Sequence, residues 1–294
     1  LDDSEGASVP LRSMDAWSVL GASTVRPGAR GIVSGTHQYP SDIRRPGMQF
    51  GAVLRAPSFG ATLESVDASA ANSVPGVTVV RDGDFVGCVA PSSRQARQAV
   101  ERIAATASWK TAPHPSSDTL SDYLRQNTNE GSGRSRSRSR EEGDVDGALA
   151  NAAKVIRATY DIPYIQHAPM ETRSAAAEWA DGRLTVWTAT QRPFDVQRDL
   201  ARSFGISPDN VRLIVPDSGG GFGGKHQPDA AGEAARLAKS AGVPVSLQWT
   251  REEEFTWAYF RPAGVIEIVA GLDAGGKTTA WDFTNYNSGG SALE

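Results

Sequence analysis

Short runs of alternating apolar and polar residues dominate the first third of the chain. Around Phe50, Val53 and Leu54 the runs are broken by Gly and Pro, a pattern that predicts short strands. The stretch "PGVTVVRDGDFVGCVA" predicts two further strands joined by a turn at Asp82 and Gly83. In "RQARQAVERIA" the apolar residues recur at helical spacing, which predicts an amphipathic helix that buries Ala96, Ala99, Val100 and Ile103. We expect a compact α+β unit over residues 26–109, after an irregular extension over residues 1–25.

The regular spacing of apolar residues is lost between residues 110 and 143, which predicts a flexible linker. This range holds "TAPHPSSD" and "NEGSGRSRSRSREEGD", with almost no large apolar residue after Leu124. Its Arg/Ser run, Arg134 to Arg140, has two interpretations: an RNA-binding segment, or a solvated connector whose charge the following carboxylates partly cancel. One short run without aromatic residues favours the connector.

Strands and helices alternate after residue 144. Asp144 is a plausible N-cap of a helix that buries Val145, Leu149, Ala152 and Ile156. Strands are predicted at "RLTVWTAT", "NVRLIVP" and "PVSLQWT", and a hairpin around Ala274–Gly276. Helices are predicted at "RPFDVQRDLARSFG", which Pro193 starts and Gly205 ends, and at "PDAAGEAARLAKSAG". This order places "SGGGFGGKH" between a strand and a helix start, where main-chain N–H groups can converge on an anion or a metal-bound oxygen.

That glycine run, Ser218 to His226, fits parts of two phosphate-binding patterns. A P-loop requires Ser or Thr after its lysine, and His226 stands there. A dinucleotide fold requires a carboxylate at the end of the next strand, and Glu252 comes late for that position. So many glycines indicate positive φ or a very close approach of another group to the main chain.

Composition narrows the classes of protein. The chain has 294 residues, 39% of them hydrophobic and 22% charged, which is ordinary for a soluble globular protein of up to two domains. The net charge of −4 gives no reason to expect a polyanionic partner, and a lone cysteine, Cys88, excludes an internal disulfide and a cysteine-based zinc site. The sequence has no apolar run of membrane-spanning length. Its last residues, "WDFTNYNSGGSALE", lead us to expect a piece of a longer protein.

Several segments together resemble the molybdenum-binding large subunit of the xanthine dehydrogenase and aldehyde oxidase family. They are "TATQRPFDVQRDLARSFGISPDNVRLIVPDSGGGFGGKH", "YIQHAPMETRSAAAEW" with its A-P-x-E element, and "DIRRPGMQFGAVLRAPSFG", which is similar to the family's hammerhead domain. "TREEEFTWAYFRPAGVIEI" and "WDFTNYNSGG" look most like the bacterial isoquinoline 1-oxidoreductase branch. The resemblance implies an α+β fold: a hammerhead domain over residues 26–109, then the N-terminal portion of an α/β molybdopterin-binding domain over residues 144–294.

The resemblance also implies a chemistry. A molybdenum–molybdopterin cofactor, in a dinucleotide form, would hydroxylate an N-heterocycle or an aldehyde with oxygen from water. Electrons would pass to [2Fe–2S] clusters on a partner. Gln191 matches the glutamine that hydrogen-bonds an oxygen ligand of the metal, and no side chain binds the metal directly. The loop matches the segment whose main chain meets the cofactor, namely Gly220, Gly221, Phe222 and Gly223.

Other positions are open to two interpretations. His226 stands where purine-oxidising members carry a substrate-binding glutamate, so it is either a substrate contact or a surface residue. Glu171 either lines the substrate pocket or pairs with Arg173, Phe260 is a further pocket candidate, and His167 is favoured as structural. The three carboxylates Glu252 to Glu254 are expected to form a solvated face.

Two classes of function follow from these observations. In the first, the chain is part of a molybdenum hydroxylase whose catalytic base and second molybdenum domain lie in an absent C-terminal half, so that the chain alone is inactive. In the second, it is a non-catalytic chain whose loop and hammerhead bind a partner.

Overall fold

The computed structural model describes residues 10–128 and 139–289. By its internal contacts the chain divides into two units, Leu1–Gln38 and Tyr39–Glu294. The first unit contains η1 (Met14–Ala16) and α2 (Ala29–Ser34), and α2 ends at Gly35 in the left-handed region that glycine favours. Within the two described ranges, no helix combines the length and the apolar character that crossing a membrane requires.

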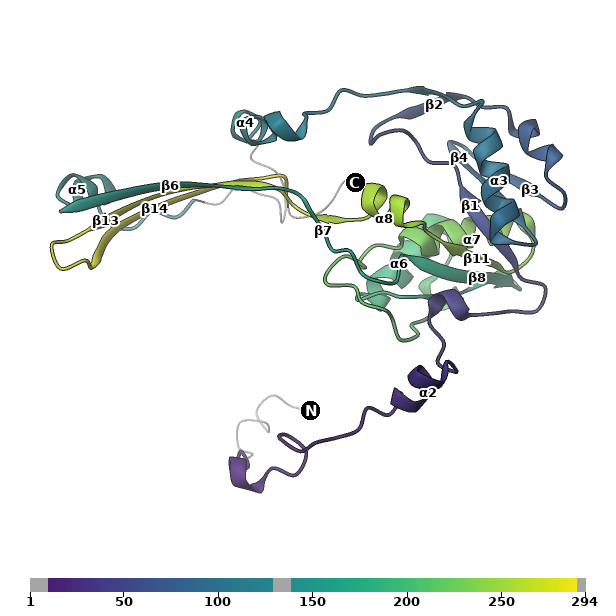
Figure 1. Cartoon of the computed structure of the whole chain (residues 1–294), viewed down its shortest axis with the longest axis horizontal. Coiled ribbons are helices and arrows are strands. Elements are labelled where there is room, and N and C mark those ends of the chain that lie inside the picture. The colour runs from purple at the N-terminus through teal and green to yellow at the C-terminus, as the bar shows by residue number, and fades with distance from the viewer. Residues whose placement is uncertain (1–9, 129–138, 290–294) are drawn as a thin grey trace. The chain divides into compact units, whose positions relative to one another are not determined.

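A seven-stranded mixed sheet is the largest sheet in the described part of the second unit (Figure 1). Its strand order is β10-β9-β8-β11-β1-β4-β3. The strands are β1 (Gln49–Val53), β3 (Thr78–Asp82), β4 (Phe85–Ala90), β8 (Ser174–Ala180), β9 (Arg183–Thr188), β10 (Val211–Ile214) and β11 (Val245–Gln248). β1 pairs in parallel with β11, with Gln49 opposite Val245. Strands from both segments that the sequence predicts as separate domains thus share one sheet, and the domain boundaries remain a prediction.

Helices pack on both faces of this sheet. They are α3 (Ser93–Ala104), α6 (Pro193–Phe204) and α7 (Asp229–Ala241). On β4, Val86 and Cys88 belong to the core that contains Ile103 of α3, whereas Val89 belongs to the core that contains Leu237 of α7. β4 is therefore buried on both faces, which explains why its sequence, "FVGCVA", is almost continuously apolar.

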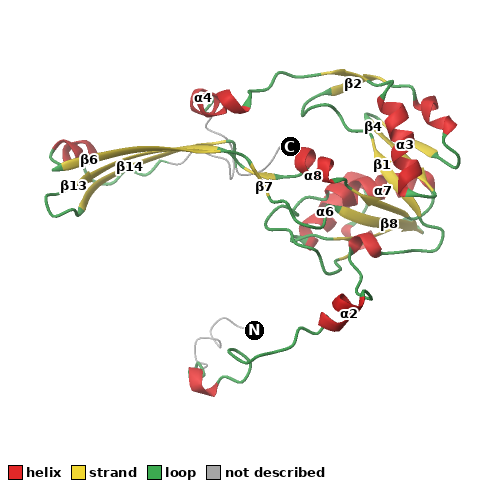
Figure 2. Ribbon diagram, viewed as in Figure 1, coloured by secondary structure: helices red, strands yellow, loops and turns green. Residues whose placement is uncertain are grey.

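A separate three-stranded antiparallel sheet contains β6 (Lys154–Ile162), β13 (Gly264–Leu272) and β14 (Thr278–Asn287), in the order β14-β13-β6 (Figure 2). Two short helices pack on it, α4 (Leu120–Gln126) and α5 (Val145–Ala150). Leu124 of α4 forms a small core with Ala263 and Val265. A Cβ on Gly271 would touch Leu149 of α5. Both helices therefore cover the face that carries Val265 and Gly271.

The other face of this small sheet is apolar and largely uncovered. Residues that are opposite one another in an antiparallel pair share a face. Phe283 lies opposite Ile268, Trp281 and Ile156 flank Ala270, and Tyr160 lies opposite Ile266. Trp281 is 55% exposed and Phe283 50% exposed. We call this set the apolar sheet face: Ile156, Tyr160, Ile266, Ile268, Trp281 and Phe283.

The remaining elements are short. β7 (Ile165–Gln166) pairs with β12 (Phe260–Arg261), and β2 (Thr62–Ser65) pairs with β5 (Ser108–Lys110). The short 3-10 helices include η2 (Pro40–Asp42), η3 (Ala68–Ser73), η4 (Ser117–Thr119) and η6 (Pro208–Asn210). The α-helix α8 (Arg251–Trp257) follows β11.

Most of the predicted elements are confirmed, but one helix is wrong in extent. Asp144 does cap a helix, because its Oδ1 accepts a hydrogen bond of 2.8 Å from Gly147 N. That helix ends at Ala150, however, and Ile156 lies on β6 with 42% of its surface exposed. The segment "KVIRATYDI" is rich in β-branched residues and pairs along its whole length with β13. The range predicted as a linker also contains a helix, α4, while its Arg/Ser run lies largely outside the described residues.

Candidate cofactor-binding loop

The glycine run lies between β10 and α7 and has an unusual backbone. Three of four consecutive positions have positive φ: 98° at Gly220, 54° at Phe222 and 94° at Gly223. Positive φ at Phe222 costs on the order of 1–3 kcal/mol, so the surrounding structure has to hold it. The Phe222 side chain is 73% exposed. The apolar side chain therefore contributes little packing to offset this strain.

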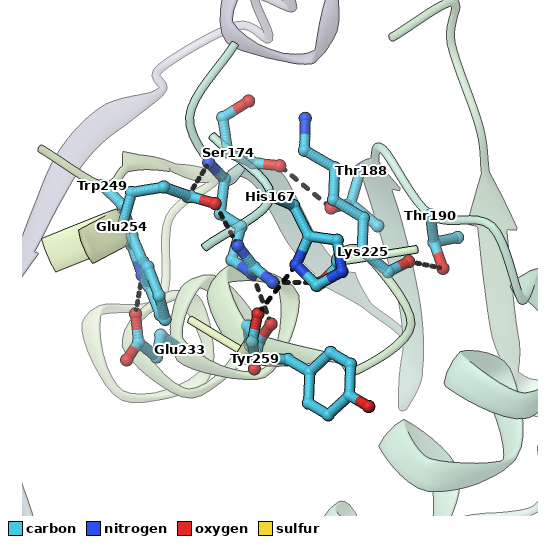
Figure 3. Close-up of polar contacts among 12 residues, drawn as sticks. His167, Ser174, Thr188, Thr190, Lys225, Glu233, Trp249, Glu254 and Tyr259 are labelled. Atoms are coloured by element: carbon cyan, nitrogen blue, oxygen red, sulfur yellow. Dashed lines mark hydrogen bonds and ion pairs between the residues drawn. The ribbon is translucent and has the colours of Figure 1, made fainter. Parts of the chain in front are cut away.

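Gln191 fixes the middle of the loop. Its Oε1 accepts hydrogen bonds from Gly223 N at 3.0 Å and Lys225 N at 3.4 Å. Its backbone N–H donates to Lys225 O at 2.9 Å, and Thr190 Oγ1 donates to the same carbonyl (Figure 3). Because both loop partners of the carboxamide are N–H donors, the atom that faces them has to be the oxygen. Nε2 is left as a donor for another acceptor.

The glycine at position 221 is explained by space rather than by φ. A Cβ there would lie 2.7 Å from Gln191 Oε1, closer than non-bonded atoms can approach. Positive φ, in contrast, explains the glycines at 220 and 223.

Glu171 holds the two ends of the loop. Its Oε2 accepts a hydrogen bond from Gly219 N at 3.1 Å and forms an ion pair with Lys225 Nζ at 2.8 Å. Both side chains of this pair are buried. The ion-pair partner of Glu171 is thus Lys225, so of the two alternatives open from the sequence the pairing with Arg173 is wrong. Its second oxygen, Oε1, is buried and has no hydrogen-bond partner within the described part of the chain.

These contacts argue against both phosphate-binding interpretations. The side chain of Lys225 is 2% exposed and its ammonium group is neutralised by Glu171, so it cannot reach a phosphate as a P-loop lysine does. The next helix, α7, begins with Asp229, which puts a carboxylate where an anion would have to bind.

Arg173 supports the loop from beneath. Its Nη2 donates to Gly224 O, and its guanidinium pairs with Asp229 and with Glu254. Glu254 is fully buried and also accepts a 2.9 Å hydrogen bond from Arg173 N, so the expectation of a solvated face at Glu252 to Glu254 is wrong for this residue. Burial raises the pKa of Asp229, and Arg173 opposes that shift.

A second arginine extends this network to the end of β1. Arg55 pairs with Glu233 of α7 and, at 2.7 Å, with Glu253 of α8. The Trp249 ring lies under the guanidiniums of Arg55, 4.7 Å away, and of Arg173, 5.5 Å away. Trp249 Nε1 donates to Glu233 at 2.7 Å (Figure 3). Burial lowers the pKa of Arg55, but Glu233 and Glu253 outweigh it, and the net shift is upward.

Two histidines border the loop. His167 Nδ1 lies 3.1 Å from Tyr259 O, so this nitrogen carries the proton and donates (Figure 3). Its ring is so close to the loop that a Cβ on Gly224 would lie 3.0 Å from it. His226 is half-buried at the end of the loop, and burial, then Arg192 and His167, lower its pKa.

The structure brings together some of the predicted residues and separates others. Gln191 and Glu171 both contact the loop directly. Phe260 lies on β12 opposite Gln166 and takes no part in the hydrogen bonds of the loop among the described residues. Nearby Arg261 donates to Pro163 O at 3.0 Å. Sequence reasoning missed the supporting roles of Lys225, Arg173, Asp229 and Glu254, since their pairings join segments far apart in the chain.

Comparison with known proteins identifies the class. A family model described as "Molybdopterin cofactor-binding domain" matches residues 128–294, more than half of the chain. The chain belongs to the molybdopterin cofactor-binding domain family. This confirms the predicted resemblance to the large subunits of molybdenum hydroxylases.

Individual relatives agree with this membership. The chain is 32% identical over 294 residues to a nicotinate dehydrogenase subunit of Pseudomonas putida, and the match covers 96% of this chain and 24% of that relative. It is 28% identical to the beta subunit of isoquinoline 1-oxidoreductase of Brevundimonas diminuta, over 90% of this chain and 35% of the relative. The crystal structure of quinoline 2-oxidoreductase from Pseudomonas putida 86 matches with a TM-score of 0.76 and 25% identity, over 90% of this chain and 39% of that one. The chain thus spans well under half the length of these relatives.

Proposed function

We propose that this chain supplies the glycine-loop side of a molybdenum–molybdopterin site in the large subunit of a hydroxylase. The observation that carries the proposal is the orientation of the Gln191 carboxamide. Gly223 N and Lys225 N hold its oxygen, so Nε2 is the group that an acceptor on a bound cofactor would meet. The role of Gln191 is then to donate a hydrogen bond to an oxygen ligand of the metal.

The loop backbone fits the same group. The N–H groups of Gly219, Gly223, Gly224 and Lys225 all have partners within the chain. Those of Gly220, Gly221 and Phe222 take part in none of the hydrogen bonds of the loop in the described ranges. Three adjacent donors on a strained, glycine-rich backbone allow a ligand to approach the main chain closely. These three residues would hold the cofactor, whereas Gly223 would act by orienting Gln191.

When bound, the molybdenum–pterin group supplies hydroxylation of an electron-poor carbon with water-derived oxygen and accepts the electron pair. The residues of this chain orient that group and do not provide the general base. Glu171 contacts the loop directly, but Lys225 neutralises its carboxylate, and its remaining oxygen, Oε1, is buried. We therefore place the base, and the [2Fe–2S] clusters, in further parts of the enzyme. A dinucleotide form of the cofactor is part of this proposal.

The apolar sheet face and the exposed Phe222 support the need for further polypeptide. Large contiguous apolar surfaces on soluble proteins usually mark interaction sites. The relatives are much longer than this chain, and the remainder of such a large subunit is the partner we propose. We propose an N-heterocycle or an aldehyde as the substrate. Relatives named for nicotinate, isoquinoline and quinoline favour the N-heterocycle.

Metal and pterin analysis of the complete enzyme from its native host tests the proposal. Gln191→Glu keeps an oxygen for the loop N–H groups but removes the Nε2 donor. We expect it to retain the cofactor and to lose turnover by about 10²- to 10³-fold, which is the rate loss typical of removing one hydrogen-bond donor to a developing charge. Gln191→Ala should lose both cofactor and turnover. Molybdenum- and pterin-free wild-type enzyme would contradict the proposal and favour a non-catalytic binding chain.

A glycine pair provides the matched control. Gly223→Val and Gly83→Val place the same side chain at positive φ, 94° and 62°, one in the loop and one in the β3–β4 turn. Only Gly223→Val should lower the cofactor content. Residues 1–294 alone should show no hydroxylase activity, and activity of the isolated chain with a dye acceptor would show that the base lies within it.

A further inference from the structure

One carboxylate oxygen joins the two ends of the glycine loop. Glu171 Oε2 is 3.1 Å from Gly219 N, where the loop begins, and 2.8 Å from Lys225 Nζ, where it ends. Glu171 N also donates to Gly219 O at 3.4 Å. The fit is tight, since a Cβ on Gly219 would lie 2.7 Å from Glu171 Cβ. The residue thus fixes the span across which the loop has to close.

All three positive-φ positions of the loop lie between these two ends. A flexible loop would relax at Phe222, because a side chain there disfavours positive φ. Strained conformations persist only where the surroundings over-determine them. Here three independent sets of contacts do so: Glu171 at the ends, Gln191 in the middle and Arg173 at Gly224 O.

Of these three, the contact through Glu171 is the one that rests on a single pair of opposite charges. Glu171 and Lys225 are both at least nine-tenths buried, with side chains 9% and 2% exposed. Removing either charge leaves the other buried and unpaired, which is strongly unfavourable. Arg173, in contrast, has two further carboxylate partners that hold it in place.

We propose that Glu171 is a positioning residue that, with Lys225, locks the glycine loop into its ligand-binding shape before any ligand is present. The N–H groups of Gly220, Gly221 and Phe222 then need no rearrangement to meet an acceptor. The identity of that acceptor as a molybdenum cofactor rests on the proposed function, but the lock itself does not. Glu171 acts on the cofactor only through the loop.

Amide hydrogen exchange on the full chain, without cofactor, tests the lock. In the wild type, the Gly223, Gly224 and Lys225 amides should exchange slowly, because all three are hydrogen-bonded. Glu171→Gln keeps an oxygen for Gly219 N but loses the charge that holds Lys225. We expect these three amides to exchange about 10- to 100-fold faster, the effect of losing one charge-assisted hydrogen bond. Amides of α3 should not change.

Two further variants separate a positioning role from a general structural one. Glu178→Gln breaks the Arg45–Glu178 ion pair of 2.8 Å and is the matched control, with no effect expected on the loop. Glu171→Gln combined with Lys225→Met removes both buried charges. Because it leaves no buried charge without a partner, its urea-unfolding midpoint should be close to that of the wild type, while the loop amides stay unprotected.

Unchanged exchange in Glu171→Gln would overturn the proposal. Loop amides that are again protected in the double variant, or unfolding of both variants, would also overturn it. The Glu171–Lys225 pair would then stabilise the fold as a whole and not the shape of the loop. The proposed function fails separately: a wild-type loop that is protected, in an enzyme that carries no molybdenum or pterin, leaves the lock standing.

Discussion

The glycine loop, which we propose as a cofactor-binding surface, and the apolar sheet face, which we propose as a polypeptide-binding surface, are built in opposite ways. The loop has an irregular, strained backbone, and charged side chains hold it in place from several elements. The small sheet has a regular ladder of backbone pairs and needs no such support, but its outward side chains are apolar and exposed. Contacts from charged side chains fix the backbone shape at the loop, whereas at the sheet the backbone ladder is regular and the apolar side chains are left exposed.

The two regions should contribute very differently to the stability of the chain. Changes to the network under the loop should cost stability, because they leave charges buried without partners. Changes to the apolar sheet face should lower the stability of the isolated chain only slightly, because those side chains are still largely exposed to solvent in the folded state.

Arg173→Met should have the largest effect. It leaves Glu254, which is fully buried, and Asp229 without their counter-charge. We expect the free energy of unfolding to fall by about 3–5 kcal/mol, measured by urea titration with tryptophan fluorescence. Arg45→Met breaks a more exposed pair and should cost at most about 1 kcal/mol. Equal losses of stability in the two variants would mean that the buried charges under the loop contribute no more to stability than the Arg45–Glu178 pair does.

The apolar sheet face should respond in the opposite way. Trp281→Gln combined with Phe283→Gln should change the free energy of unfolding by less than about 1 kcal/mol. Binding of a hydrophobic dye such as ANS to the folded chain should decrease. A loss of stability as large as that of Arg173→Met would show that this face is covered within the isolated chain.

The smallest effect concerns His226 at the end of the loop. Burial and the charges of Arg192 and His167 lower its pKa, which disfavours the charged form of the ring in the folded chain. Because the folded pKa lies below the ordinary value of about 6.5, the associated stability is present above that pH and is lost as the pH falls through the folded pKa. An NMR titration of the ring C–H signals should show the low midpoint. Arg192→Gln should raise it, and a midpoint above that of the urea-unfolded chain would contradict the assignment.

Local signals predict most of the fold. Helix α6 is predicted from Pro193 at its start and Gly205 at its end, and the structure confirms both as the helix boundaries. The turn at Gly83 is predicted from the Asp-Gly pair and has the expected positive φ. The wrong extension of the helix after Asp144 has a tertiary cause, since Ile156 is held on β6 by pairing with β13, more than 100 residues later.

The candidate site is predictable only in part, for the same reason. The glycine run and Gln191 stand out in the sequence, and the structure places them in contact. The partner of Glu171 could not be predicted, because Arg173 is its neighbour in sequence while Lys225 is its neighbour in space. The burial of Glu254 could not be predicted either, because it is one of three consecutive carboxylates that look alike in the sequence. Only Glu254 pairs with Arg173 among the described contacts.

The parallel pairing of β1 with β11 has a consequence for biosynthesis. Gln49 leaves the ribosome long before its partner Val245, and at about 5–20 residues per second the intervening chain takes about 10 to 40 s to make. Throughout that interval one edge of β1 is an open strand next to a largely apolar β4. The nascent chain is therefore exposed to mispairing with neighbouring chains until the second half of its sheet emerges.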